Sequence, residues 1–492
     1  MGARQNPCYM LFNSLVFVAV FLPLVLAALA LLARWTAPGA VAWLGLASLV
    51  FYSVCAFEYL PLLMVSVGVN YLLGMRLADA HARSSKAATR WLLVTALGFN
   101  LTLLAYYKYA GFAAATAQAW LGQPIAFAAP LLPVGISFFT FTQIAFVVDA
   151  SRGRIADRGF ARYLLFVTYF PHLIAGPILH HAVMLPQFAV RGFGRIGARD
   201  LQAGLAIFAV GLAKKVLLAD QAAEFVGPVF DGAADPRLTP QDAWIGALAY
   251  TFQIYFDFSG YSDMAIGLAR MMGVTLPENF RSPYKSSNII EFWRCWHISL
   301  SNFLRDYLYV PLGGNRKGVA RRYGNLFITM LLGGLWHGAS WTFVLWGGLH
   351  GAFVVINHGW HHLSRRMGYA LPSPIGWLLT MLAVVGAWVF FRASSTEAAA
   401  ALLRCMVGLQ PALEAGRAVG FDTLRAWSTI TCCAAVALAL PNTWQWRERL
   451  AGASARSRVL WLGLGALVAL TLLLVLMAES AVSRSAFIYF NF

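Results

Sequence analysis

Long apolar segments recur along the whole chain, and they restrict it to one kind of fold. Each is about long enough to cross a bilayer as a helix, which takes roughly 20 residues. Only 12% of the 492 residues are charged, about half the share in an ordinary soluble domain. We therefore expect an all-α, polytopic transmembrane helical bundle with about 11–12 spans plus re-entrant segments around a central core. The segments lie near residues 14–33, 41–56, 59–75, 91–107, 124–148, 202–219, 243–269, 325–341, 342–362, 375–391, 426–441 and 459–478.

The net charge of +17 fits the same interpretation. In a soluble chain such a charge would suggest nucleic acid as a partner. Here the basic residues lie in short loops between apolar segments, which is the pattern of cytoplasmic loops in membrane proteins. We therefore exclude nucleic acid and expect membrane lipid around the chain. The six cysteines form no Cys-x-x-Cys pair or Cys/His ligand spacing, so no metal is expected.

Two segments between basic loops are expected to enter the membrane without crossing it. Residues 163–181 lie between two loops that should both be cytoplasmic, and they contain the helix-breaking run from Phe170 to Pro177. Residues 270–322 are basic and interrupted by prolines, and they hold an apolar-aromatic piece that predicts a short helix entering from the cytoplasmic face. The final residues, 487–492, are aromatic and should lie at the external interface.

One histidine lies within the most apolar part of the chain. His337 is an ionisable group in a stretch expected at membrane depth, where such a group costs free energy and is by default a functional-site hypothesis. The surrounding Gly333, Gly334 and Gly338 predict open space beside the imidazole for a thin substrate. Gly334 and Gly338 also form a small-xxx-small pair suited to close helix packing. The alternative is a histidine hydrogen-bonded inside a bundle.

A second histidine, His297, lies 40 residues earlier on the proline-broken segment. Neutral imidazole is well matched to proton transfer near pH 7, so we predict His337 and His297 as catalytic residues within one or two side-chain lengths of each other. The alternative for His297 is an interfacial residue bonded to backbone. A metal site would need a third ligand, and His350 is the nearby candidate, but the usual ligand spacing is missing.

A polar island interrupts the apolar segment at residues 253–263, where polar side chains recur at i, i+4 and i+8 on one helical face. Carboxylates at this depth need partners. They can orient His297 or pair with arginines such as Arg281 or Arg294, and we favour a structural ion-pair network. The expected supporting residues are Gln253, Asp257, Tyr261, Asp263 and Trp336.

Four cations precede the segment that carries His337. They are suited to the phosphates of a cytoplasmic donor, but the plainer interpretation is that they set the topology. The residues are Arg316, Lys317, Arg321 and Arg322.

Several motifs together resemble the membrane-bound O-acyltransferase family, and within it the bacterial alginate O-acetyltransferase subgroup. The similarity covers nearly the whole chain. It lies in Pro133-Val-Gly-Ile-Ser-Phe-Phe-Thr-Phe, Phe256-Asp-Phe-Ser-Gly-Tyr-Ser-Asp263, Pro277-Glu-Asn-Phe, Phe292-Trp-Arg-Cys-Trp-His-Ile-Ser-Leu-Ser301, Tyr309-Val-Pro-Leu-Gly-Gly-Asn315, Leu335-Trp-His-Gly-Ala, Met10-Leu-Phe-Asn-Ser, Trp388-Val-Phe-Phe-Arg392 and Phe487-Ile-Tyr-Phe-Asn-Phe492.

The resemblance implies a single membrane domain over residues 1–492, with residues 393–492 as a C-terminal extension of about two further helices. It places the family's invariant histidine on His337 and its second polar position on His297. It also implies acetyl-coenzyme A as a cytoplasmic donor substrate rather than a bound cofactor. The partners implied are a separate periplasmic SGNH-hydrolase-like acetyltransferase and a polysaccharide synthesis and export complex.

Our interpretation is a bacterial inner-membrane O-acetyltransferase that serves an exported polysaccharide of the alginate or cellulose type. Three alternatives stay open. Two keep the chemistry and change the substrate: O-acetylation of peptidoglycan, or transfer of a D-alanyl group. The third is a lipid or sugar transporter, which needs no histidine base.

Overall fold

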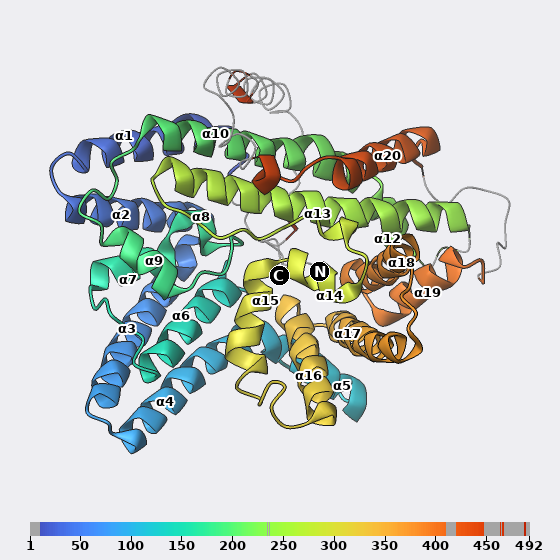
Figure 1. Ribbon diagram of the computed structural model, residues 1–492, viewed down its shortest axis with the longest axis horizontal. Helices are drawn as coiled ribbons and strands as arrows, with labels where there is room; N and C mark the ends of the chain where they lie inside the picture. Colours follow the sequence, from blue (N-terminus) through green and yellow to red (C-terminus); the bar gives the residue numbers. More distant parts are fainter. Residues whose placement is uncertain are drawn as a thin grey trace. The chain divides into compact units, whose positions relative to one another are not determined.

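The computed structural model describes residues 10–233, 235, 237–409, 420–446, 463, 465–466 and 487–488. Every regular element within these ranges is helical, which confirms the all-α prediction (Figure 1). The chain divides into two compact units. Of the described residues, the first comprises 10–212, 261–277, 463, 465–466 and 487–488, and the second comprises 213–233, 235, 237–260, 278–409 and 420–446.

The first unit is built from apolar helices that bury a few paired polar side chains. On α3 and α4, Asn70 and Asn100 exchange amide hydrogen bonds of 3.2 and 2.6 Å, so neither buried amide is left unsatisfied. Its helices are η1 (Val16–Phe21), α1 (Leu22–Leu32), α2 (Ala37–Ala56), η2 (Phe57–Tyr59), α3 (Leu60–Ala82), α4 (Lys86–Leu104), η3 (Ala105–Tyr109), α5 (Ala110–Leu121), α6 (Ile136–Ser151), α7 (Phe160–Thr168), α8 (Phe170–Leu173), α9 (His181–Phe188) and nearly all of α10 (Ala198–Ala213).

Two of the expected segments in this unit have different outcomes. The interval 163–181 holds only the end of α7 and the four-residue α8, too short to cross a bilayer, so the prediction of a non-spanning segment is confirmed. The expected span at 124–148 is wrong, because helix begins only at Ile136. Pro124, Pro130 and Pro133 precede it, and proline removes a backbone donor and clashes with the preceding turn.

The second unit contains His297 and His337. Its largest feature is a helical hairpin of α16 and α17, which lie side by side in Figure 1. The α13 helix runs through both units, with residues 240–260 in this one. The helices of this unit are η4 (Lys214–Ala219), α11 (Asp220–Ala223), α12 (Val226–Phe230), α13 (Pro240–Met271), η5 (Pro283–Lys285), α14 (Ile289–Cys295), α15 (Ile298–Leu304), η6 (Arg305–Tyr309), α16 (Val319–His337), α17 (Trp341–Met367), α18 (Ser373–Arg392), α19 (Thr396–Met406) and α20 (Thr423–Ala439).

Length and composition support a multi-pass membrane protein. Four helical stretches of the described chain are long and apolar enough to cross a bilayer, and three apolar ones are shorter. This is fewer than the expected 11–12 spans. The α13, α16 and α17 helices have 32, 19 and 27 residues, but each carries polar or charged groups and does not join the four. The expected segment at 459–478 lies almost wholly outside the described residues. The four stretches are Ala37–Ala82, Lys86–Leu121, Ala198–Phe230 and Ser373–Arg392.

Candidate functional site

His337 is the last residue of α16, at the turn of the hairpin. The chain leaves the helix in an extended conformation at Gly338, and the Ser340 side chain accepts a hydrogen bond from the Thr342 backbone N–H to cap α17. Only 2% of His337 is exposed. The imidazole is therefore held at a fixed end of a helix and shielded from the surroundings.

The glycines near His337 pack the hairpin and leave no open space. A Cβ on Gly334 would lie 2.8 Å from the Gly347 Cα, and a Cβ on Gly338 would lie within 3 Å of the Phe343 ring. A Cβ on Gly333 would lie 3.1 Å from Leu304. Close packing is confirmed at Gly334, whereas Gly338 lies beyond the end of α16, so the two glycines do not form a small-xxx-small pair on one helix. The prediction of a glycine-lined space is wrong because α17 and neighbouring side chains fill it.

Aromatic rings surround the His337 imidazole. The ring centroids of Trp336, Trp346 and Phe391 lie 5.0, 5.1 and 5.2 Å from that of His337, all in edge-to-face arrangements. Trp336, expected as a supporting residue, is 5% exposed and also lies 6.3 Å from His297. These rings fix the imidazole plane and exclude water, which strengthens any interaction with charge that develops there.

His297 lies between two seven-residue helices, α14 and α15, and is fully buried. Its ring centroid lies 6.5 Å from that of His337, so the predicted convergence of the two histidines is confirmed. The short helices also confirm the predicted non-spanning segment. His297 adopts φ +42°, a left-handed conformation that is uncommon for a residue other than glycine. Such strain persists only when surrounding contacts over-determine it.

Asn279 supplies those contacts, although its residue type and position in the sequence predict no role for it. Its Oδ1 lies 3.1 Å from His297 Nδ1 and accepts hydrogen bonds from the Ser299 backbone N–H and from Ser299 Oγ. Its backbone carbonyl accepts from the Ile298 N–H at 3.0 Å. Because Oδ1 is an acceptor, His297 Nδ1 carries the proton, and the lone pair lies on Nε2. The Phe258 ring packs edge-on against the imidazole at 4.7 Å.

His297 is a neutral side chain in this setting. It lies outside the spanning helices, and burial alone lowers the pKa of its imidazole to about 3. A neutral imidazole can accept a proton through one nitrogen and donate through the other. The single signal in the sequence for the partner of His297 is the motif Pro277-Glu-Asn-Phe, in which the asparagine is Asn279.

Asp257 forms a buried ion-pair network, as favoured from the sequence, but with a different cation. Lys215 Nζ lies 2.7 Å from Asp257 and 2.9 Å from Asp220, and Lys215 and Asp257 are each 1% exposed. The expected partner Arg281 instead pairs with Glu278. Both acidic partners satisfy the lysine charge, which would otherwise be costly at this depth. Asp257 therefore anchors α13 one residue before the Phe258 that packs on His297.

The other polar residues of α13 have separate surroundings. Gln253 is partly buried, and its Oε1 has no hydrogen-bond partner among the described residues. Tyr261 and Asp263 belong to the first unit, where both are buried. Tyr261 stacks on Phe12 and meets Phe487 edge-on, each at 4.9 Å between centroids. Phe487 is 1% exposed, and residues 489–492 of the same tail lie outside the described residues, so the position of the tail at the external interface stays a prediction.

The four expected donor-binding cations lie at the opposite end of α16 from His337. Arg316, Lys317 and Arg321 are exposed, and Arg322 lies 3.4 Å from His358 Nδ1. Arg322 and His337 are 15 residues apart on the helix, about 22 Å along its axis. Such a separation prevents contact between these cations and the reacting atoms at His337, so any role they have in the reaction is in binding.

His350 lies beside the site, packed among aromatic rings. It is fully buried on α17 and accepts a hydrogen bond from Trp293 Nε1 at 3.3 Å. Its ring packs 4.8 Å from Trp346, which also contacts His337. Within the described chain, no three His, Cys, Asp or Glu side chains are placed to hold a metal ion.

Comparison with known proteins relates the sequence to one family of membrane enzymes. The model of the membrane-bound O-acyltransferase family matches residues 91–399, which include both histidines and Asn279. A peptidoglycan O-acetyltransferase of Helicobacter pylori is 40% identical over 427 residues, covering 81% of this chain and 80% of the relative. A probable alginate O-acetylase of Pseudomonas putida is 43% identical over 403 residues, again covering 81% and 80%. A teichoic acid D-alanyltransferase of Streptococcus thermophilus is 27% identical, covering 46% and 57%.

Proposed function

The chain belongs to the membrane-bound O-acyltransferase family, and from that premise we propose that it acetylates an exported polysaccharide with acetyl-coenzyme A as the cytoplasmic donor. It is a multi-pass membrane enzyme, an O-acyltransferase. The observation that carries the proposal is the pair of buried imidazoles, 6.5 Å apart between ring centroids, inside an aromatic enclosure. We place it in a bacterial inner membrane, as the relatives are bacterial.

The proposed chemistry is general base catalysis at His337. Its imidazole takes the proton of the acceptor hydroxyl while the hydroxyl oxygen attacks the thioester carbonyl. The new C–O bond forms, the C–S bond breaks, and the coenzyme A thiolate leaves with the proton that His337 then returns. The aromatic walls exclude water, which would otherwise hydrolyse the thioester.

His297 is proposed to orient or share the transferred proton. Because Asn279 accepts a hydrogen bond from the Nδ1–H, the acceptor nitrogen of the His297 ring is Nε2. A fixed tautomer matters, because a flipped or rotated ring would present a donor where an acceptor is needed. Asn279 and Ser299 thus act through His297 and position it.

The donor is proposed to enter from the cytoplasmic side, where the cationic end of α16 lies by the positive-inside rule. Arg316, Lys317, Arg321 and Arg322 are suited to its phosphates as binding groups. A periplasmic hydrolase-like acetyltransferase is proposed to complete the transfer to the polymer, beside a synthesis and export complex.

Two polymers are supported to a similar degree. The alginate O-acetylase and the peptidoglycan O-acetyltransferase are 43% and 40% identical to this chain, so both acceptors remain in the proposal. The support for D-alanyl transfer is weaker, because the teichoic acid D-alanyltransferase of Streptococcus thermophilus aligns with less than half of this chain.

The test uses membranes that contain the full chain, radiolabelled acetyl-coenzyme A, and either alginate-type polymer or peptidoglycan with its export machinery. We expect release of free coenzyme A and label on one polymer. A transporter would move acceptor without consuming thioester. Label from D-alanyl donors but not from acetyl-coenzyme A would contradict the proposal.

A further inference from the structure

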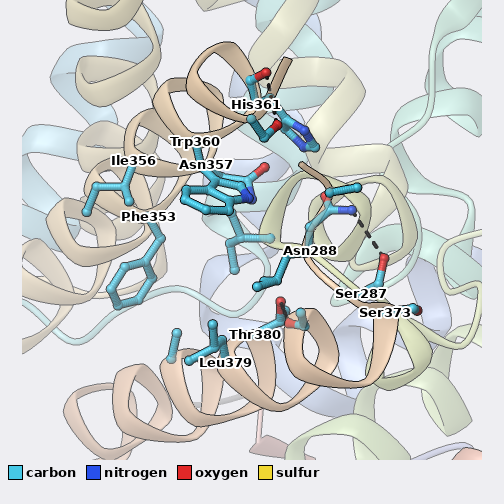
Figure 2. A pocket seen from close by; sticks show the side chains of 16 residues that line it. Ser287, Asn288, Phe353, Ile356, Asn357, Trp360, His361, Ser373, Leu379 and Thr380 are labelled. Atoms are coloured by element: carbon cyan, nitrogen blue, oxygen red, sulfur yellow. Dashed lines mark hydrogen bonds between the residues drawn. The ribbon is translucent and has the colours of Figure 1, made fainter. Parts of the chain in front are cut away.

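A groove of about 510 Å³ lies within the second unit, apart from the histidine pair. One wall is the C-terminal half of α17, another is the first half of α18, and the chain at Ser287–Ile289 closes one side (Figure 2). Its volume is within the range of sites for small organic ligands. Nothing in the proposed chemistry uses it, so its occupant is a separate question.

The position of the groove relative to the bilayer follows from its two helices. Residues Ser373–Arg392 form one of the long apolar helices, and the groove follows them from Ser373 to Ala383. The α17 helix ends with Arg365 and Arg366, which the positive-inside rule places on the cytoplasmic side. The groove therefore lies in the cytoplasmic leaflet, with its shallow end beside these cations.

The groove opens toward lipid. Ile356 and Leu379, on its two helical walls, are 66% and 54% exposed. Leu379 lies on α18, one of the four stretches long and apolar enough to cross a bilayer, so its exposed side chain faces hydrocarbon chains. A ligand can therefore enter sideways from the leaflet, without passing through water.

The lining changes from polar to apolar along the groove. Ser364 and His361 lie near the end of α17, and Ser373 lies at the start of α18. At the other end are Phe353 and Ala383. Figure 2 shows the same division, with Ser287, Asn288 and Ser373 grouped away from Phe353, Ile356 and Leu379. A molecule with a polar head and an apolar tail matches this gradient in one orientation.

A buried amide oxygen lies midway along the groove, between its polar and apolar ends. Asn357 Oδ1 is shielded from solvent and has no hydrogen-bond partner among the described residues. Leaving such a group unpaired costs free energy, and the amide can present either its oxygen or its NH₂ by rotation. The glycerol region of a phospholipid carries ester oxygens at this depth, between headgroup and chains, and these can accept a hydrogen bond from the amide NH₂.

We propose that this groove binds one anionic phospholipid of the cytoplasmic leaflet. The phosphate lies toward His361 and Arg365, the glycerol region meets Asn357, and one acyl chain lies along Phe353 and Leu379 toward Ala383. The sign of the headgroup follows from the cations at the end of α17 and the lack of an acidic residue among those that line the groove. The inference depends on the membrane topology and not on the proposed acetyl transfer.

The test is native mass spectrometry of the purified full chain after exchange into phosphatidylglycerol, phosphatidylethanolamine or diacylglycerol. We expect the wild type to keep one phosphatidylglycerol at energies that remove the other two lipids. Ala383→Trp, which fills the apolar end, should lower that occupancy at least five-fold. Leu382→Trp is the matched control, because Leu382 is the adjacent residue, is 47% exposed and does not line the groove; it should leave occupancy unchanged.

Two further variants separate the parts of the site. Arg365→Gln should bring retention of phosphatidylglycerol down to that of phosphatidylethanolamine, while Asn357→Leu should weaken retention of both. Equal phosphatidylglycerol occupancy in Ala383→Trp, Asn357→Leu and the wild type would overturn the proposal. So would one-for-one displacement of the lipid by acetyl-coenzyme A, which would assign the groove to the donor.

Discussion

The two ends of α16 differ in every property that decides how a residue can contribute to a reaction. At the C-terminal end, His337 is buried, enclosed by aromatic rings and packed by glycines. At the other end, Arg316 and Lys317 are exposed. Buried groups act with little screening, whereas exposed charges are screened by salt and attract ligands from a distance. This difference supports our proposal that proton transfer and capture of the donor take place at opposite ends of one helix.

The largest effect should come from His337→Ala. Removing a general base typically costs a factor of about 10² to 10⁴ in rate. We expect kcat for acetyl transfer to fall by at least about 100-fold, with the amount of inserted protein and its Tm near those of the wild type. Radiolabel transfer to polymer measures kcat. Near-normal transfer by this variant would show that the buried end of α16 does not supply the base.

The next effect should come from Asn279→Ala, which removes the acceptor of the His297 Nδ1–H. Loss of an orienting partner of a functional histidine costs about 10- to 100-fold in comparable sites, so we expect a fall of that size in kcat with KM nearly unchanged. Asn279→Asp keeps the acceptor and should recover part of the activity.

A double-mutant cycle distinguishes positioning from general damage. If Asn279 acts through His297, the Asn279→Ala change should add little loss in a His297→Ala background. The control is Asn325→Ala, another buried asparagine of the second unit, whose amide donates to the Gly314 carbonyl. Additive losses in the cycle would mean that Asn279 acts independently of His297.

Gly347→Ala tests the packing of α17 against α16, which holds the buried C-terminal end of α16 in place. A Cβ on Gly347 would lie 2.6 Å from the Met330 carbonyl oxygen, so Gly347→Ala must separate α16 from α17. Overpacking of this kind costs about 1–3 kcal/mol, and we expect a lower Tm in detergent. Gly386→Ala is the control, because a Cβ at Gly386 meets nothing within 4 Å. Equal Tm values for the two variants would refute close packing at this crossing.

The smallest effect should come from neutralising the exposed end. Replacing Arg316, Lys317, Arg321 and Arg322 with glutamine should raise the KM for acetyl-coenzyme A about 3- to 10-fold, while kcat changes less than about two-fold, because exposed ion pairs contribute little each. The rise should shrink in high salt. An unchanged KM in a correctly inserted variant would leave these residues as topology signals alone.

The sequence was sufficient for features that depend on period and composition. Apolar runs predicted the helical membrane fold, and the proline-interrupted stretch between residues 270 and 322 predicted the non-spanning segment that carries His297. Helix-breaking residues act locally, so their effect can be predicted without tertiary structure.

Features that depend on which side chains meet were not predictable. Asp257 pairs with Lys215, 42 residues earlier, because η4 lies beside α13, and no local pattern indicates that pairing. The glycines around His337 were expected to leave space, but a partner helix uses that space for close packing. Asn279 was missed because its role depends on the loop that returns beside His297.

The central claim is that the two ends of α16 have separate tasks. The most direct test is to measure kcat and KM for acetyl-coenzyme A in His337→Ala and in the quadruple glutamine variant, in the same membranes and the same assay. We expect His337→Ala to lower kcat with little change in KM. We expect the quadruple glutamine variant to raise KM with little change in kcat. A fall in the same constant for both variants would contradict the central claim.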